Sequence, residues 1–167
     1  VPASAQLRIV TYNTANGTFP SGNDASPRTG MDNVLQAIAN EVTNGISRPI
    51  DALIFQEHDE PYTTTQEFVD LLNGIYGAGT YARSSGVTLP NYDDNIRQTL
   101  VYNTNTLSLI GDITFGETGS GKAARQTARY ELRPVGYGVE AGFLVYNSHY
   151  KAGSSSSDQA RRDFEAN

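Results

Sequence analysis

The chain has 167 residues, a mass of 18.1 kDa and a formal net charge of −6, from 12 basic and 18 acidic side chains. This length suits one domain or part of a larger one. Hydrophobic residues make up 38% of the chain and include 10 Tyr and 6 Phe, which is enough for a core. Cysteine is absent, which excludes disulfides, thiolate metal sites and cysteine nucleophiles. The acidic balance lacks the basic footprint expected of a protein that holds nucleic acid electrostatically.

The N-terminal part of the sequence predicts a strand followed by a helix. Residues 1–6 are expected to form a tail, and residues 7–12 are β-branched and aromatic enough for a strand. From Met31 onward apolar residues recur at helical spacing, and Gly45 stands where a C-cap glycine is expected. The apolar positions of this helix are Val34, Leu35, Ile38 and Val42.

A second strand and a second helix follow in the same order. Residues 51–55 form a short, nearly continuous apolar run, typical of a strand covered on both faces, and the polar sequence QEHD comes at its end. Thr64 and Glu67 have the spacing of a capping box, ahead of a helix that Gly77 would close. The apolar face of this helix would contain Phe68, Leu71, Leu72 and Ile75.

The second half of the sequence changes to a pattern of successive strands. Four strand candidates are separated by turns, at residues 99–102, 108–115, 126–133 and 142–149. Successive strands imply antiparallel pairing, and residues 157–167 would form the first turns of a helix. A mixed α/β pattern with mostly antiparallel strands favours a layered sandwich over a doubly wound parallel sheet.

Polar side chains stand at the ends of three apolar strands. Asn13 follows the first strand, Glu57 the second, and His149 ends the last. Because strands fix position, polar residues at their ends can be held over one common rim. Taken singly, each has a structural explanation, as a turn residue, a solvated strand end and a hydrogen-bonded edge histidine. Their joint occurrence favours a functional site.

These strand ends lie in motifs that resemble a known family. LRIVTYNTAN, DALIFQEHD and FLVYNSHYKAG followed by QARRDFEAN are similar, in order, to successive motifs of the endonuclease/exonuclease/phosphatase superfamily. That group includes DNase I-like nucleases, sphingomyelinases and inositol polyphosphate 5-phosphatases. The resemblance spans residues 7–167 and implies part of a four-layer α/β/β/α sandwich with mixed, mainly antiparallel sheets.

The resemblance also implies an activity and a metal site. Asn13 and Glu57 match residues that bind a divalent metal in this family, here Mg²⁺ or Mn²⁺, and His149 matches the histidine that acts at the scissile phosphate. Mg²⁺ takes a few hard oxygen ligands and completes its shell with water and phosphate. The implied function is hydrolysis of a phosphoester, in the nuclease or phosphatase class, by an activated water. Arg129 and Arg97 are candidates for phosphate contacts, although a solvated sheet face also explains them.

The sequence departs from the family pattern beyond His149. Full members continue with Asp-x-Asn and Asp-His elements, which orient and deprotonate the attacking water, and neither follows His149 here. Residues 7–167 are therefore interpreted as the N-terminal two-thirds of a catalytic domain that is impaired alone. Such a chain is expected to expose apolar faces that a C-terminal half or a covering partner would bury. His58 and Asp59 are expected to be structural.

Composition also bears on location and on a rival function. Few lysines, many small polar residues and Ala3-Ser4-Ala5, which would suit a cleavage site, favour an extracellular or cell-surface protein. No run approaches the ~20 apolar residues of a membrane span, so no transmembrane segment is expected. The alternative function is a non-catalytic surface or adhesion module. Nucleic acid stays open as a phosphoester substrate, because a metal and a few arginines can supply local attraction.

One further motif has the pattern of a phosphate-binding loop. Residues 116–122 satisfy G-x-x-x-x-G-K after an expected strand, but Ala123 stands where Ser or Thr would hold Mg²⁺. The residues that follow alternate with strand period and do not begin a helix, whose N-terminus such a loop needs. A Gly/Ser turn between antiparallel strands is the better interpretation.

Overall fold

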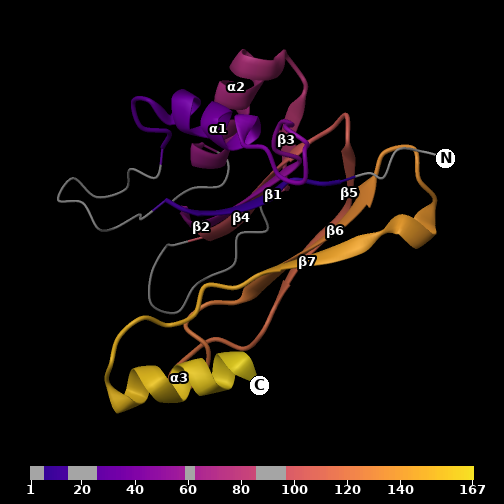
Figure 1. Cartoon of the computed structure of the whole chain (residues 1–167). Coiled ribbons are helices and arrows are strands. Elements are labelled where there is room, and N and C mark those ends of the chain that lie inside the picture. Colours follow the sequence, from indigo (N-terminus) through magenta and orange to yellow (C-terminus); the bar gives the residue numbers. More distant parts are fainter. Residues whose placement is uncertain (1–5, 15–25, 59–62, 86–96) are drawn as a thin grey trace.

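The computed structural model describes residues 6–14, 26–58, 63–85 and 97–167. Within these residues, two β-sheets and three α-helices form, which makes the fold α/β (Figure 1). Residues 1–5, which include Ala3-Ser4-Ala5, lie outside the described residues, as does Asp59.

The first sheet contains four strands in the order β1-β2-β4-β3. These are β1 (Ile9–Asn13), β2 (Ala52–His58), β3 (Tyr81–Arg83) and β4 (Arg97–Asn103). β1 and β2 are parallel, whereas β4 runs antiparallel to both β2 and β3. Because β1 and β2 run in the same direction, Asn13 and Glu57 lie at the same end of this sheet.

Two helices cover one face of the first sheet (Figure 1). They are α1 (Met31–Asn40) and α2 (Thr64–Tyr76). The buried cluster between helices and sheet includes Leu35, Phe68 and Leu72 from the helices and Leu53, Phe55 and Val101 from the strands. This packing fixes β2, the strand that carries Glu57, from its helix-facing side.

The end of α1 differs from the prediction. The helix ends at Asn40 rather than near Gly45, and Val42 is 65% exposed. The backbone N–H of Arg48 donates to the carbonyl oxygen of Ala39, which satisfies one of the acceptors that a helix end leaves open. The chain therefore turns back toward the sheet before Val42 can join the apolar face.

The capping box predicted at the start of α2 is wrong, whereas the predicted end of the helix is confirmed. Thr63 is the N-cap and Thr64 is the first helical residue, so the predicted capping box between Thr64 and Glu67 does not form. Thr64 is instead buried. Gly77 caps the C-terminus with φ of 108°, a conformation that glycine adopts without steric cost.

The second sheet contains three antiparallel strands in the order β5-β6-β7. These are β5 (Leu107–Phe115), β6 (Thr127–Pro134) and β7 (Phe143–Asn147), with a short 3-10 helix, η1 (Val139–Ala141), before β7. A second buried cluster lies between the two sheets. It contains the inward residues of β6, which are Ala128, Tyr130 and Leu132, together with Ile54 and Leu100 of the first sheet. The two sheets therefore pack face to face.

The C-terminal residues form α3 (Ser156–Ala166), as the sequence predicts. Ser155 and Asp158 make a capping box at its start. Figure 1 shows α3, in yellow, far from α1 and α2 and next to the second sheet. No residue of α3 is buried, so polar contacts rather than apolar packing hold this helix in place.

The outer face of the second sheet exposes apolar side chains, as expected from the sequence. This outer apolar face consists of Ile113, Phe115, Leu144 and Tyr146, each at least 44% exposed. Strand alternation turns these side chains away from the first sheet. Among the described helices, none has the length and apolar character needed to cross a membrane.

Candidate active site

The structure brings two of the three predicted site residues into contact. Nε2 of His149 lies 3.3 Å from Oε1 of Glu57, and the two side chains are 17% and 18% exposed. Glu57 comes from β2 in the first sheet, and His149 lies two residues beyond the end of β7 in the second. Partial burial strengthens the electrostatic interaction of this pair and still leaves it open to a ligand.

Asn13 lies at the same end of the first sheet as this pair. It is the last residue of β1, and its Cα is opposite that of Gln56, the residue before Glu57. Side chains paired across neighbouring strands share a face of the sheet. Because Gln56 reaches across to Asn147, strand pairing puts Asn13 on the face of the first sheet that is turned toward the second sheet.

Glu57 has an unusual backbone conformation. Its φ is 59°, in the left-handed region, at a bulge that shifts the pairing of β2 with β4 between Phe55 and His58. A non-glycine residue held there costs about 1–3 kcal/mol, and such residues cluster at functional sites. Bulges also re-aim side chains at the ends of strands. The strained residue in this strand is the one whose side chain meets His149.

Hydrogen bonds from two other strands hold the backbone around Glu57. After β1, Thr14 is 6% exposed, and its Oγ1 donates to the carbonyl oxygen of Glu57 at 2.7 Å. From β7, Asn147 Nδ2 donates to the carbonyl oxygen of Phe55 at 2.8 Å, and its Oδ1 accepts from Gln56 Nε2 at 2.8 Å. These bonds supply the free energy that keeps the strained conformation in place.

His58 anchors the end of β2 on the face of the first sheet that the helices cover. It is a core residue, as expected. Its side chain is fully buried, and its ring stacks on Phe55 with centroids 4.1 Å apart. Nδ1 lies 3.0 Å from the hydroxyls of Thr65 and Thr99. Burial lowers the pKa of His58 to about 3, because the charged imidazolium would lose its hydration. His58 is therefore neutral at pH 7 and packs away from the Glu57–His149 pair.

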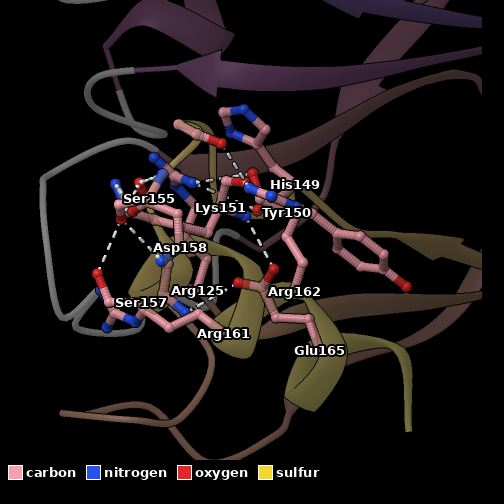
Figure 2. Close-up of polar contacts among 12 residues, drawn as sticks. Arg125, His149, Tyr150, Lys151, Ser155, Ser157, Asp158, Arg161, Arg162 and Glu165 are labelled. Carbon is pink, nitrogen blue, oxygen red and sulfur yellow. Dashed lines mark hydrogen bonds and ion pairs between the residues drawn. The ribbon is translucent and has the colours of Figure 1, made fainter.

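The segment after β7 is held by residues that the sequence did not single out. Arg125, 9% exposed, donates from Nη1 to the carbonyl oxygens of His149 and Tyr150 at 3.4 and 3.5 Å. Glu165 of α3 accepts from the backbone N–H of Lys151 at 2.8 Å. Figure 2 shows these side chains around the 149–151 segment. His149 thus lies on a backbone fixed by two charged groups, rather than on the strand itself.

Of the two arginines predicted to contact phosphate, Arg129 is not brought to this pair. Arg129 lies between the inward residues Ala128 and Tyr130 of β6, so alternation puts it on the outer face, opposite Tyr146. We therefore exclude Arg129 from the site. Arg97 begins β4 opposite His58, and its side chain lies outside the described residues.

The 116–122 loop is a connection between the antiparallel strands β5 and β6, as interpreted from the sequence. Arg161 of α3 donates to the carbonyl oxygens of Gly119 and Lys122, each at 3.0 Å. Lys122 forms an ion pair with Glu117. The loop therefore presents carbonyl oxygens to the guanidinium group of Arg161. A phosphate-binding loop instead presents backbone N–H groups to an anion.

The oxygen donors predicted from the sequence fit a weakly chelated hard cation. Within the described residues, no group of three or more His, Cys, Asp or Glu side chains could hold a metal ion. The donors predicted from the sequence are one carboxylate, from Glu57, and one amide oxygen, from Asn13. Such a set fits Mg²⁺, which is bound through one or two carboxylates and keeps several waters. It lacks the nitrogen and sulfur donors of a structural zinc site.

Asn147 is a further buried polar residue that sequence reasoning missed. It continues the inward positions of β7, after Phe143 and Val145, and is 2% exposed. The available signal was a polar residue at an inward position of a strand whose other inward residues are apolar. A buried amide at such a position must find hydrogen-bond partners, which indicates a structural or functional role. Its partners lie on the other sheet, so the strand pattern of β7 alone could not name them.

No protein-family model matches the sequence, and no curated protein matches it. Assignment of a function therefore depends on the geometry of the Glu57–His149 pair and on the motifs in which these residues lie.

Proposed function

We propose that this chain is a metal-dependent phosphoesterase domain of the endonuclease/exonuclease/phosphatase type. The observation that carries the proposal is the 3.3 Å contact between Glu57 and His149, two strand-end residues far apart in the sequence. The motif resemblance requires this convergence, and the strained backbone of Glu57 adds independent support. The α/β fold with two sheets is compatible with the four-layer sandwich of that family, which we include in the proposal.

The chemistry follows from the residues of the pair and from Asn13. Glu57 and Asn13 would hold Mg²⁺ or Mn²⁺ through hard oxygen atoms. When bound, the ion would neutralise charge on the phosphoryl oxygens. His149 would donate a hydrogen bond from Nε2 to a phosphate oxygen or to the leaving group. In the chain without ligand, the Glu57 carboxylate lies 3.3 Å from this same nitrogen, and a bound phosphate would take its place as the acceptor of the Nε2 hydrogen bond.

The charge of the chain makes local attraction necessary. The net charge of −6 repels a phosphoester at long range. A cation at Glu57 would offset this repulsion at the site. The proposed substrate class is therefore a phosphoester that is recognised at short range through its phosphoryl oxygens, and nucleic acid is one member of that class.

Titration with Mn²⁺ tests the proposal without requiring turnover. We expect one Mn²⁺ site in the wild-type chain by calorimetry and at least a tenfold weaker affinity in Glu57→Gln, a loss of ~1.4 kcal/mol or more. Glu131→Gln is the matched control, because Glu131 is an exposed carboxylate on the outer face of β6. Equal affinity in wild type and Glu57→Gln would contradict the metal site.

The alternative function is a non-catalytic surface or adhesion module. The observation in its favour is the outer apolar face of the second sheet, since exposed apolar patches often mark interaction sites. A folded wild-type chain that binds no Mn²⁺ in the same titration would favour this alternative.

A further inference from the structure

Asn147 connects the two sheets directly beside the Glu57–His149 pair. Its buried amide uses both of its ends, donating to the carbonyl oxygen of Phe55 and accepting from Gln56, each at 2.8 Å. Phe55 and Gln56 are the two residues before Glu57 in β2. His149 follows Asn147 by two residues. Along the chain, the bridge is therefore one or two residues from each member of the pair.

We propose that Asn147 is a positioning residue, which sets the separation of the Glu57 carboxylate and the His149 imidazole. This inference rests on the proposed function of that pair. Elsewhere the sheets meet mainly through apolar side chains such as Ile54, Leu100 and Leu132. Two further hydrogen bonds link β4 to the β6 side, from Tyr130 Oη to the carbonyl oxygen of Gln98 and from Gln98 Nε2 to the carbonyl oxygen of Gln126. Apolar contact is non-directional, so it holds the two sheets together without defining the offset of one sheet along the other. Hydrogen bonds are restricted in distance and angle. The Asn147 amide bonds to the two residues before Glu57, so it is the directional link that defines the offset beside the pair.

The other anchors of the pair act within one sheet or one loop. Thr14 bonds to the Glu57 carbonyl oxygen and links β1 with β2 in the first sheet. Arg125 bonds to the carbonyl oxygens of His149 and Tyr150 on the side of the second sheet. Replacement of Asn147 leaves both anchors in place. It should therefore change the placement of the two residues relative to each other more than the local structure around either of them.

The environment of the His149 ring reports this placement without any assay of activity. The chain contains 2 His, and His58 is buried and neutral, so His149→Gln identifies the His149 signals in ¹⁵N- and ¹³C-histidine NMR spectra. Glu57→Gln then gives the shift that accompanies loss of the carboxylate contact. We expect Asn147→Ala to reproduce at least half of that shift at His149.

Two further variants make the test specific. Gln56→Ala removes one of the two bonds of Asn147, so its effect on His149 should lie between those of wild type and Asn147→Ala. Because Gln56 is only partly buried, this variant decides the question if Asn147→Ala does not fold. Asn103→Ala is the matched control, since Asn103 is 6% exposed and its Oδ1 accepts from the Asn105 N–H in the turn after β4. We expect less than a tenth of the Glu57→Gln shift from this control.

Wild-type His149 signals in folded Asn147→Ala or Gln56→Ala would overturn the positioning role, as would an equal shift in Asn103→Ala. Failure of the proposed function has a different signature, namely the same Mn²⁺ affinity in wild type and Glu57→Gln. If both proposals hold, Asn147→Ala should also weaken binding of inorganic phosphate to the Mg²⁺-loaded chain at least threefold, with a smaller change in Mg²⁺ affinity. The spectroscopic and binding results therefore separate the two proposals.

Discussion

Lowering the pH from 6.5 to 4.5 is expected to reduce the free energy of unfolding by about 2 kcal/mol through His58. Burial lowers the pKa of His58 to about 3 in the folded chain, whereas the ordinary value near 6.5 holds in the unfolded chain. Between these values the unfolded chain binds a proton that the folded chain does not. The contribution of neutral His58 is therefore fully present above pH 6.5 and is lost progressively as the pH falls toward 3.

Urea denaturation at several pH values measures this effect. His58→Gln should flatten the dependence between pH 6.5 and 4.5, because the glutamine amide does not titrate there. His149→Gln, which removes the other histidine, should retain it. The comparison uses the slopes, since the variants also differ in packing against Phe55. An unchanged slope in His58→Gln would show that His58 is not the group that titrates.

The affinity of the Mg²⁺-loaded chain for inorganic phosphate should fall at least tenfold in His149→Ala. A hydrogen bond to a charged group contributes about 1.5–3 kcal/mol, which corresponds to a factor of about 10 or more in affinity. Affinity for Mg²⁺ should stay equal or rise, because the variant removes a group 3.3 Å from the Glu57 carboxylate that can carry positive charge. Calorimetric titration of each ligand separates the two effects.

Arg133→Gln is the control for general loss of positive charge. Arg133 shares the polar positions of β6 with Arg129, on the face turned away from the first sheet. We expect this variant to bind phosphate as the wild type does. If phosphate affinity falls equally in Arg133→Gln and His149→Ala, binding depends on overall charge and not on His149.

Apolar periodicity predicted most of the fold, because burial repeats every second residue in a strand and every 3.6 residues in a helix. It identified β2, α2 and the β5-β6-β7 series. It failed at the end of α1, where Val42 continues the pattern but the chain has already left the helix. It also missed β3, which has 3 residues and is too short to show a period.

The site was harder to predict because it forms between two sheets. The sequence indicates that Glu57 and His149 stand at strand ends, but their approach depends on how the sheets pack. The left-handed backbone of Glu57 gives no sequence signal, since glutamate disfavours that conformation and only the surrounding bonds impose it. Arg129 was the avoidable error, because its place between Ala128 and Tyr130 already puts it on the outer face.

Anomalous diffraction from crystals grown with Mn²⁺ tests the central claim most directly. The account predicts an anomalous peak within bonding distance of a Glu57 carboxylate oxygen, with the Asn13 side chain and the His149 ring beside it. The same crystals of Glu57→Gln should lack that peak. A manganese ion bound only elsewhere, or none at Glu57 in a chain whose Glu57–His149 contact is intact, would contradict a metal-dependent phosphoesterase site.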